Sequence, residues 1–448
     1  MKEKKISLEA INSMRNDFYK SSKYRALQNV VARTDIKQVA LNWDKFATVS
    51  HTFSDKITPE LAATSQSQSG RCWIFAVLNL LRIPMAEKHN INDFEFSQSY
   101  LFFWDKFEKA NYFFENVIDT AKEPHDSRLV MYLFDSSSLF SDGGQWHMAV
   151  NLINKYGLVP KSVFPDNEAC LSSGQFNQIL KSKLREQGVV LRKLVAGGST
   201  SKKILEAKNK MLEEIYRMLS LHMGTPPNHF NWEFYDKDKN FHSFKKLTPH
   251  TFYKKHLKVN LNDYVCLVNS PRKQTPYYKT FTVKCLGNVI EGDPILYLNV
   301  PIEEMKSVAI KSLKANEPVW LGCDVAKSFH HGLGVMDLNL YDLELIYDVS
   351  FATTKEMRMN YGESKMTHAM LFTGVNLVDK KPNKWCVENS WGDKPGKKGY
   401  FMMTDEWFDE YMFEIAVHKK YLPKKLIKLL SLPEISLDPW DPLGALAL

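Results

Sequence analysis

Paired cysteines are missing from this sequence of 448 residues. Its six cysteines lack the close spacing that marks zinc sites or disulfide frameworks. They stand at positions 72, 170, 266, 285, 323 and 386. The neighbouring His330 and His331 also have no metal-ligand partner at a useful spacing. The pattern predicts free thiols in a reducing cytosol and no metal or other cofactor.

Long apolar runs are missing as well. No run approaches the length of a membrane span, and the first residues, Met-Lys-Glu-Lys-Lys-Ile-Ser, lack the apolar core of a secretory signal. We therefore expect a cytoplasmic protein with no membrane partner. The sequence also has no low-complexity stretch and no internal repeat, and its length suggests two or three structural units.

The sequence has a small excess of positive charge. Lysine and arginine number 59 against 51 aspartates and glutamates, which gives a formal net charge of +8. Such a balance is compatible with an acidic partner such as nucleic acid. The signatures of nucleic-acid-binding modules are absent, so we favour a mildly basic surface and leave nucleic-acid binding as the weaker alternative.

A polar turn followed by an apolar run is the most informative stretch. The turn begins at Gln66, and the residues from Cys72 to Leu81 are almost all apolar, which predicts a buried helix. Pro84 is expected to end or kink that helix. The free N–H groups at a helix start favour a thiolate, although most intracellular cysteines are small buried residues with no chemistry.

The chain divides by the type of its predicted elements. Residues 1–60 form a helical arm, and 61–164 form a helical part that carries Cys72. Residues 165–260 are predicted to be an inserted helical unit, and strands dominate 261–420. Residues 421–448 form a C-terminal arm. Helices and strands are segregated, so the fold class is α+β.

The N-terminal arm offers an amphipathic helix. Ser7 can cap this helix, whose apolar residues share one face: Leu8, Ile11, Met14 and Phe18. No catalytic residue is visible there, so we expect a role in packing or assembly.

Two downstream stretches change the interpretation of Cys72. His368 starts a predicted strand and Asn389 ends the next one, so antiparallel pairing can bring them side by side. A cysteine nucleophile needs a histidine that takes and returns its proton, and an asparagine can orient the imidazole. Gln66 can offer an amide to the oxyanion, and Trp391 can shield the His–Asn hydrogen bond from water.

A glycine pair adds a further candidate. Gly143 and Gly144 follow Asp142 in a sharp turn before a predicted helix. Adjacent glycines allow close backbone approach, either for a tight turn or for a bound extended peptide. As an isolated signal, the turn is the favoured interpretation.

Three blocks resemble papain-like cysteine peptidases, in the order of that family. They are Gln66-x5-Cys72-Trp73, His368-Ala369 and Asn389-Ser390-Trp391-Gly392. The sequence departs from the papain motif at Gly70, where that motif has a disulfide-bonded cysteine, and the Cys-to-His distance is about twice the minimal one. With these insertions the chain resembles the bleomycin hydrolase and aminopeptidase C group. Further matching stretches are Glu95 to Lys106, Asp142 to Trp146, Gly362 to Ser364, Thr404 to Phe408 and Trp440 to Leu448.

The resemblance implies a fold, an assembly and an activity. The fold would be papain-like, with a helical left part, an antiparallel β-barrel-like right part, an inserted helical unit and a hook from both chain ends. The group forms homohexamers with active sites facing an inner cavity. Its members remove single N-terminal residues from peptides, cleave the amide of bleomycin and open homocysteine thiolactone.

The resemblance also implies roles for individual residues. The catalytic set would be Cys72, His368 and Asn389. Gly143 and Gly144 would meet the substrate backbone. The C-terminus would lie in the cleft, where the carboxylate of Leu448 pairs with the free α-amine of the substrate. Two alternatives stay open: an acyltransferase with the same catalytic set, and a basic nucleic-acid-binding protein.

Overall fold

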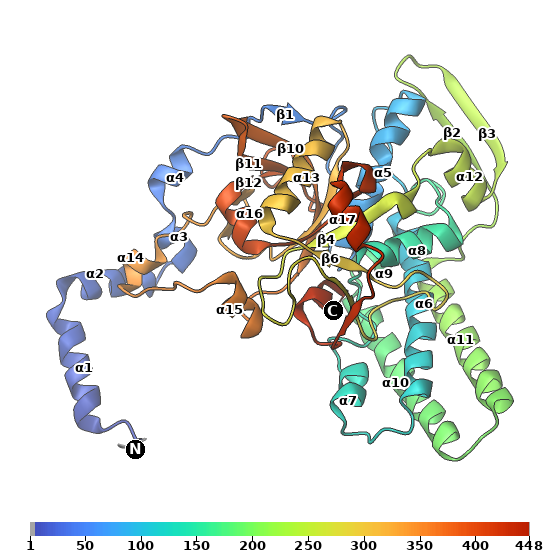
Figure 1. The fold of residues 1–448 in the computed structure, drawn as a ribbon, viewed down its shortest axis with the longest axis horizontal. Helices are drawn as coiled ribbons and strands as arrows, with labels where there is room; N and C mark the ends of the chain where they lie inside the picture. Colours follow the sequence, from blue (N-terminus) through green and yellow to red (C-terminus); the bar gives the residue numbers. More distant parts are fainter. Residues whose placement is uncertain (1–4, 448) are drawn as a thin grey trace.

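The computed structural model describes residues 5–447. Its N-terminal arm consists of α1 (Leu8–Lys20), α2 (Ser22–Val31), α3 (Ile36–Ala40) and α4 (Trp43–Ala47), and it extends away from the rest of the molecule (Figure 1). The side chain of Ser7 accepts a hydrogen bond from the Ala10 N–H, so the predicted cap is confirmed. No residue of α1 or α2 is buried, which leaves the apolar face of α1 uncovered by residues 5–447.

The helical part is built around α5 (Cys72–His89), of whose 18 residues 14 are buried. The other helices of this part are α6 (Gln98–Asp119), α7 (Arg128–Phe134) and α8 (Trp146–Tyr156), and the short helix α9 (Glu168–Leu171) opens the next segment. Pro84 does not end the central helix, because α5 continues to His89, and a kink at this proline stays a prediction. Packing of buried side chains on both sides of the proline holds the helix together despite the missing N–H.

The segment 165–260 is helical only in part. Its elements are α10 (Gly174–Ala196), α11 (Ser201–Met223), β2 (Phe230–Tyr235), β3 (Phe241–Leu247) and α12 (Pro249–His256). Helices α10 and α11 pack against α6. The hairpin β2–β3 corrects the prediction of a helical unit. Trp232 stacks on Phe244 across its two strands, and such aromatic pairs stabilise a short hairpin.

One large mixed sheet occupies most of the chain after residue 260. Its strands run in the order β14-β5-β6-β4-β13-β7-β10-β11-β12-β9-β8, and β1 (Asp55–Lys56) adds to β10. The central run from β4 to β12 pairs antiparallel, as expected, whereas β4–β6, β5–β14 and β9–β12 are parallel. The strands are β4 (Tyr264–Val268), β5 (Thr280–Val283), β6 (Tyr297–Asn299), β7 (Val319–Cys323), β8 (Phe329–His330), β9 (Val335–Met336), β10 (His368–Val378), β11 (Lys381–Glu388), β12 (Tyr400–Thr404), β13 (Met412–His418) and β14 (Ile435–Leu437).

The two faces of this sheet are covered by different helices. Helix α5 packs against β10 and β7 on one face, where Trp320 donates its indole N–H to the carbonyl of Trp73 at 3.4 Å. Helix α13 (Ile302–Lys314) and α16 (Asp405–Tyr411) bury the core on the other face. The remaining short helices are α14 (Leu343–Tyr347), α15 (Lys355–Asn360), α17 (Lys424–Leu429), η1 (Leu261–Asp263), η2 (Lys419–Tyr421) and η3 (Pro442–Ala447). The fold therefore places the start of α5 against the start of β10.

Candidate active site

Cys72 is the first residue of α5, directly after the polar turn. Its side chain is buried, and Sγ accepts a hydrogen bond from the backbone N–H of Ala369 at 3.4 Å. Ala369 follows His368 at the start of β10. The fold therefore brings the sulfur next to the strand end that carries the histidine, although the two lie almost three hundred residues apart in the chain.

His368 and Asn389 are joined directly. Strand β10 pairs antiparallel with β11, with Leu371 opposite Glu388, so the start of one strand lies beside the end of the other. His368 Nε2 lies 2.8 Å from Asn389 Oδ1, and both residues are buried. The same Oδ1 accepts the Ser390 N–H at 2.7 Å. An oxygen that accepts from a backbone donor is fixed as the acceptor, so Nε2 carries the proton and Nδ1 keeps its lone pair.

Trp391 covers this pair. The centroids of the Trp391 and His368 rings lie 4.9 Å apart, with the planes tilted by 34°. An aromatic ring at this distance can keep water from the hydrogen bond to Asn389, and a lower local dielectric constant would strengthen that bond. The shielding predicted for Trp391 is consistent with this geometry.

Gln66 is held in the turn by both ends of its amide. Its Oε1 accepts from the Ser390 hydroxyl at 2.6 Å, and its Nε2 donates to the Ser69 carbonyl at 2.5 Å. Its backbone N–H donates to the carbonyl of Ser390 at 2.8 Å, and Gly392 donates to the carbonyl of Thr64 at 2.9 Å. These contacts tie the turn before Cys72 to the segment after Asn389. An amide has two N–H groups, so one remains for an oxyanion.

The two glycines of the turn at 142–144 have different neighbours. A Cβ at Gly143 would lie 2.1 Å from the carbonyl oxygen of Leu446, so this glycine admits the C-terminal segment. A Cβ at Gly144 would lie 2.5 Å from the ring of Trp73. Packing against Trp73 thus accounts for a glycine at 144, and contact between Gly144 and substrate stays a prediction.

The C-terminal segment lies against this turn. Ser141 donates its hydroxyl to the carbonyl of Ala447, and Tyr297 donates to the carbonyl of Leu443 at 3.3 Å. Further back, Arg272 donates two hydrogen bonds to the carboxylate of Asp441, at 2.8 and 3.1 Å. Leu448, the residue predicted to contact the substrate amine, lies outside the described residues.

Burial sets the protonation of the candidate pair. It raises the pKa of the Cys72 thiol to about 11, although N–H groups of Ala369 and of the helix start lower it. Burial also lowers the pKa of His368 to about 4. The hydrogen bond to Asn389 acts in the opposite direction and raises this pKa, but its effect is smaller. The expected thiolate is therefore not the favoured form of this closed pocket. The helix start acts in the predicted direction, but desolvation is the larger effect.

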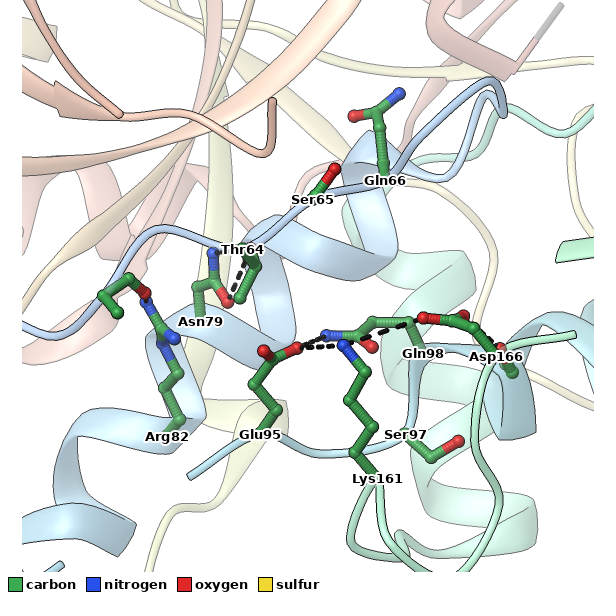
Figure 2. A network of polar contacts seen from close by, with 12 residues as sticks. Thr64, Ser65, Gln66, Asn79, Arg82, Glu95, Ser97, Gln98, Lys161 and Asp166 are labelled. Atoms are coloured by element: carbon green, nitrogen blue, oxygen red, sulfur yellow. Dashed lines mark hydrogen bonds and ion pairs between the residues drawn. The ribbon is translucent and has the colours of Figure 1, made fainter. Parts of the chain in front are cut away.

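Sequence reasoning gave no role to several buried charges beside the site. Asp142 accepts from the Gly70 N–H at 3.1 Å and pairs with Lys106 at 2.7 Å, which fixes the turn before Cys72. Arg82 and Asn79 project from α5 (Figure 2). The available signal was their place in an otherwise apolar helical run, because buried polar residues need partners.

Among residues 5–447, all six cysteines are free, and no cluster of three or more His, Cys, Asp or Glu side chains is placed to hold a metal ion. None of the helices described is both long and apolar enough for a membrane span.

Comparisons with known proteins agree over nearly the whole chain. The model of the peptidase C1-like family matches residues 5–444. Bleomycin hydrolase from Gallus gallus is 46% identical over 94% of both chains, and aminopeptidase C from Listeria innocua is 42% identical over 99% of both. The crystal structure of PepW from Lactobacillus rhamnosis superposes with a TM-score of 0.96 at 45% identity, covering 98% of this chain and 99% of the other. The chain therefore belongs to the peptidase C1-like family of cysteine peptidases.

Proposed function

We propose that this protein is a cysteine aminopeptidase that releases N-terminal residues from peptides through an acyl-enzyme on Cys72. The observation that carries the proposal is the hydrogen bond from the Ala369 N–H to Sγ, beside a histidine that is itself bonded to Asn389. Relatives named aminopeptidase C support the exopeptidase activity. Relatives named bleomycin hydrolase support the amide of bleomycin as a second substrate.

The reaction follows from the protonation of the pocket. Neutral His368 accepts the thiol proton at Nδ1 while Sγ attacks the scissile carbonyl carbon, so charge separates only as the bond forms. The oxyanion accepts hydrogen bonds from the backbone N–H of Cys72 and from the side-chain amide of Gln66. His368 then gives its proton to the leaving amine. A water then attacks the thioester carbonyl and loses its proton to His368. The C–S bond breaks, the N-terminal residue leaves as a free acid, and His368 returns the proton to Sγ.

The C-terminal segment supports an exopeptidase rather than an endopeptidase. It already lies on Gly143, where an extended substrate would otherwise continue. We propose that the carboxylate of Leu448 pairs with the free α-amine of the substrate and blocks longer chains. Cleavage is then set one residue from the amine.

Compartment and assembly complete the proposal. Six free thiols support a cytoplasmic location. The uncovered apolar face of α1, together with the family resemblance, supports a homohexamer.

The decisive experiment is Cys72→Ala assayed on aminoacyl arylamides. We expect no turnover by the variant and loss of wild-type turnover after treatment with iodoacetamide. Cys285→Ser is the matched control, because Cys285 is partly exposed and the other five cysteines are buried. This control should keep both its activity and its sensitivity to iodoacetamide. Activity of Cys72→Ala near that of the wild type would refute the proposal.

A further inference from the structure

A buried carboxylate stands directly before Asn389. Glu388 is the last residue of β11 and is 3% exposed. It accepts from the guanidinium of Arg82 at 2.5 Å and from the amide of Asn79 at 2.8 Å. Both donors come from α5, the helix that begins at Cys72. The side chain of Glu388 therefore joins α5, the helix of Cys72, to the end of β11, directly before Asn389.

The same donors hold the segment that leads to Gln66. Arg82 donates to the carbonyl of Ala62 at 2.7 Å, and Asn79 donates to the Thr64 hydroxyl at 3.0 Å. Figure 2 shows both side chains leaving one helix, with Thr64 beside Asn79 and Gln66 farther along the same segment. The cluster thus connects the helix of Cys72, the segment that leads to Gln66 and the strand end before Asn389.

Stability alone does not explain an ion pair in this place. Removing both charges from water is costly, and apolar side chains of similar size usually serve a core equally well. The Nε of Arg82 is buried with no hydrogen-bond partner among residues 5–447, so the cluster is not fully satisfied. A directional pair, unlike an apolar contact, fixes the distance and angle between the two segments that it joins.

We propose that Glu388, held by Arg82 and Asn79, is a positioning residue for the site of Cys72, His368 and Asn389. This inference rests on the proposed function. Glu388 acts through Asn389: while its carboxylate is anchored to α5, the backbone that follows cannot shift. Asn389 then stays in contact with Nε2 of His368, and the orientation of the imidazole stays fixed. Without the anchor, Asn389 and the ring are free to drift from the helix start.

The test separates positioning from stability. The double variant Arg82→Met/Glu388→Met replaces the pair by apolar side chains of similar reach. We expect it to unfold at a temperature equal to or above that of the wild type. Its kcat, counted per site titrated with an irreversible thiol reagent, should fall about tenfold with KM little changed, because misplacement weakens proton transfer. Glu388→Gln, which keeps an acceptor for Asn79, serves as a second variant and should lose less.

Two further measurements make the result specific. The pH profile of kcat/KM should move to lower pH on its acidic side, because the contact with Asn389 raises the pKa of His368. Lys306→Met is the matched control. Lys306 pairs with Asp405 at 2.7 Å between α13 and α16, on the far face of the sheet. This control should lose stability but keep its kcat per titrated site and its pH profile.

The outcomes are distinguishable. If both variants at Glu388 keep kcat within about twofold of the wild type and the same pH profile, the positioning role is wrong. Cys72→Ala is assayed alongside them. Turnover by that variant would overturn the proposed function itself, whatever the variants at Glu388 show.

Discussion

At the scale of single residues, the site depends on how burial divides a proton between sulfur and imidazole. Burial raises the pKa of the Cys72 thiol and lowers that of His368, so both effects favour the uncharged pair. Asn389 partly offsets the effect of burial on the pKa of His368, because its Oδ1 accepts a hydrogen bond from Nε2 of the ring. The reactivity of the sulfur therefore depends on what surrounds the histidine as much as on the helix start.

Replacing the ring that shields His368 should move the pH dependence. In Trp391→Ala, water reaches the imidazole, and the pKa of His368 rises from about 4 toward its ordinary value of 6.5. Because the base must be neutral, activity is lost as the pH falls through this pKa. The acidic limb of the pH profile of kcat/KM should thus shift to higher pH. The profile is measured after a check that the variant stays folded. Tyr235→Ala, an exposed aromatic residue of β2, is the control, and an unmoved limb in Trp391→Ala would contradict the shielding role.

The amide of Gln66 can be tested against a neighbour in the same turn. Gln66→Ala should lower kcat roughly 100-fold or more, the loss typical of one oxyanion donor, with KM little changed. Gln68→Ala is the control, because that side chain is exposed and its backbone carries the contacts of the turn. Steady-state kinetics on an aminoacyl arylamide measure both. Equal losses in the two variants would indicate a damaged turn rather than a lost donor.

At the scale of elements, the C-terminal segment is anchored by a few polar contacts that lie apart along it. The bidentate pair of Arg272 and Asp441 holds its start, and the hydroxyl of Ser141 holds Ala447. Between these contacts the backbone forms only the short helix η3. A segment with so little regular structure depends on its anchors to remain against the turn at 142–144.

Releasing that segment should change the choice of substrate. Deleting residues 445–448 should lower turnover of free-amine peptides and raise turnover of N-acetylated ones, because the pairing group for the amine is gone. Arg272→Met should act in the same direction but more weakly, since it only loosens the segment. Turnover of the two peptide types is compared with Lys425→Met, which removes a pair on the surface. Unchanged preference after the deletion would refute the role of the tail.

Sequence patterns were sufficient to predict some of the helices and strands but not others. The buried helix after Cys72 and the cap at Ser7 were predicted correctly, because both depend on residues close together in the chain. The continuation of α5 past Pro84 was not predicted, because it depends on packing against segments that are distant in the sequence. The hairpin β2–β3 was also missed: its short aromatic strands lie in a region of mostly helical pattern.

The site shows the same division. His368 and Asn389 could be named from their places at the ends of neighbouring strands. The partners of Arg82 and Asn79 could not, because no local pattern says which distant carboxylate a buried donor will meet. Gly143 illustrates a third case: the glycine signals a close approach, but only the fold shows that Leu446 makes it.

At the scale of the whole molecule, the N-terminal arm stands apart from the body (Figure 1). Met14 is 65% exposed on the apolar face of α1. If this face is covered by other copies of the chain, Met14→Asp should break the assembly into smaller species without lowering the unfolding temperature of the single chain. Light scattering after gel filtration measures the mass, with Asn12→Asp as the control. An unchanged mass for Met14→Asp would place the contacts between copies elsewhere.

The hydrogen bonds between the turn at Gln66 and the segment after Asn389 have one more consequence. They join the turn before Cys72 to the segment after Asn389, so these two parts of the candidate site are held at a fixed distance from each other. We therefore expect the choice of substrate to depend on the fixed spacing of these two segments.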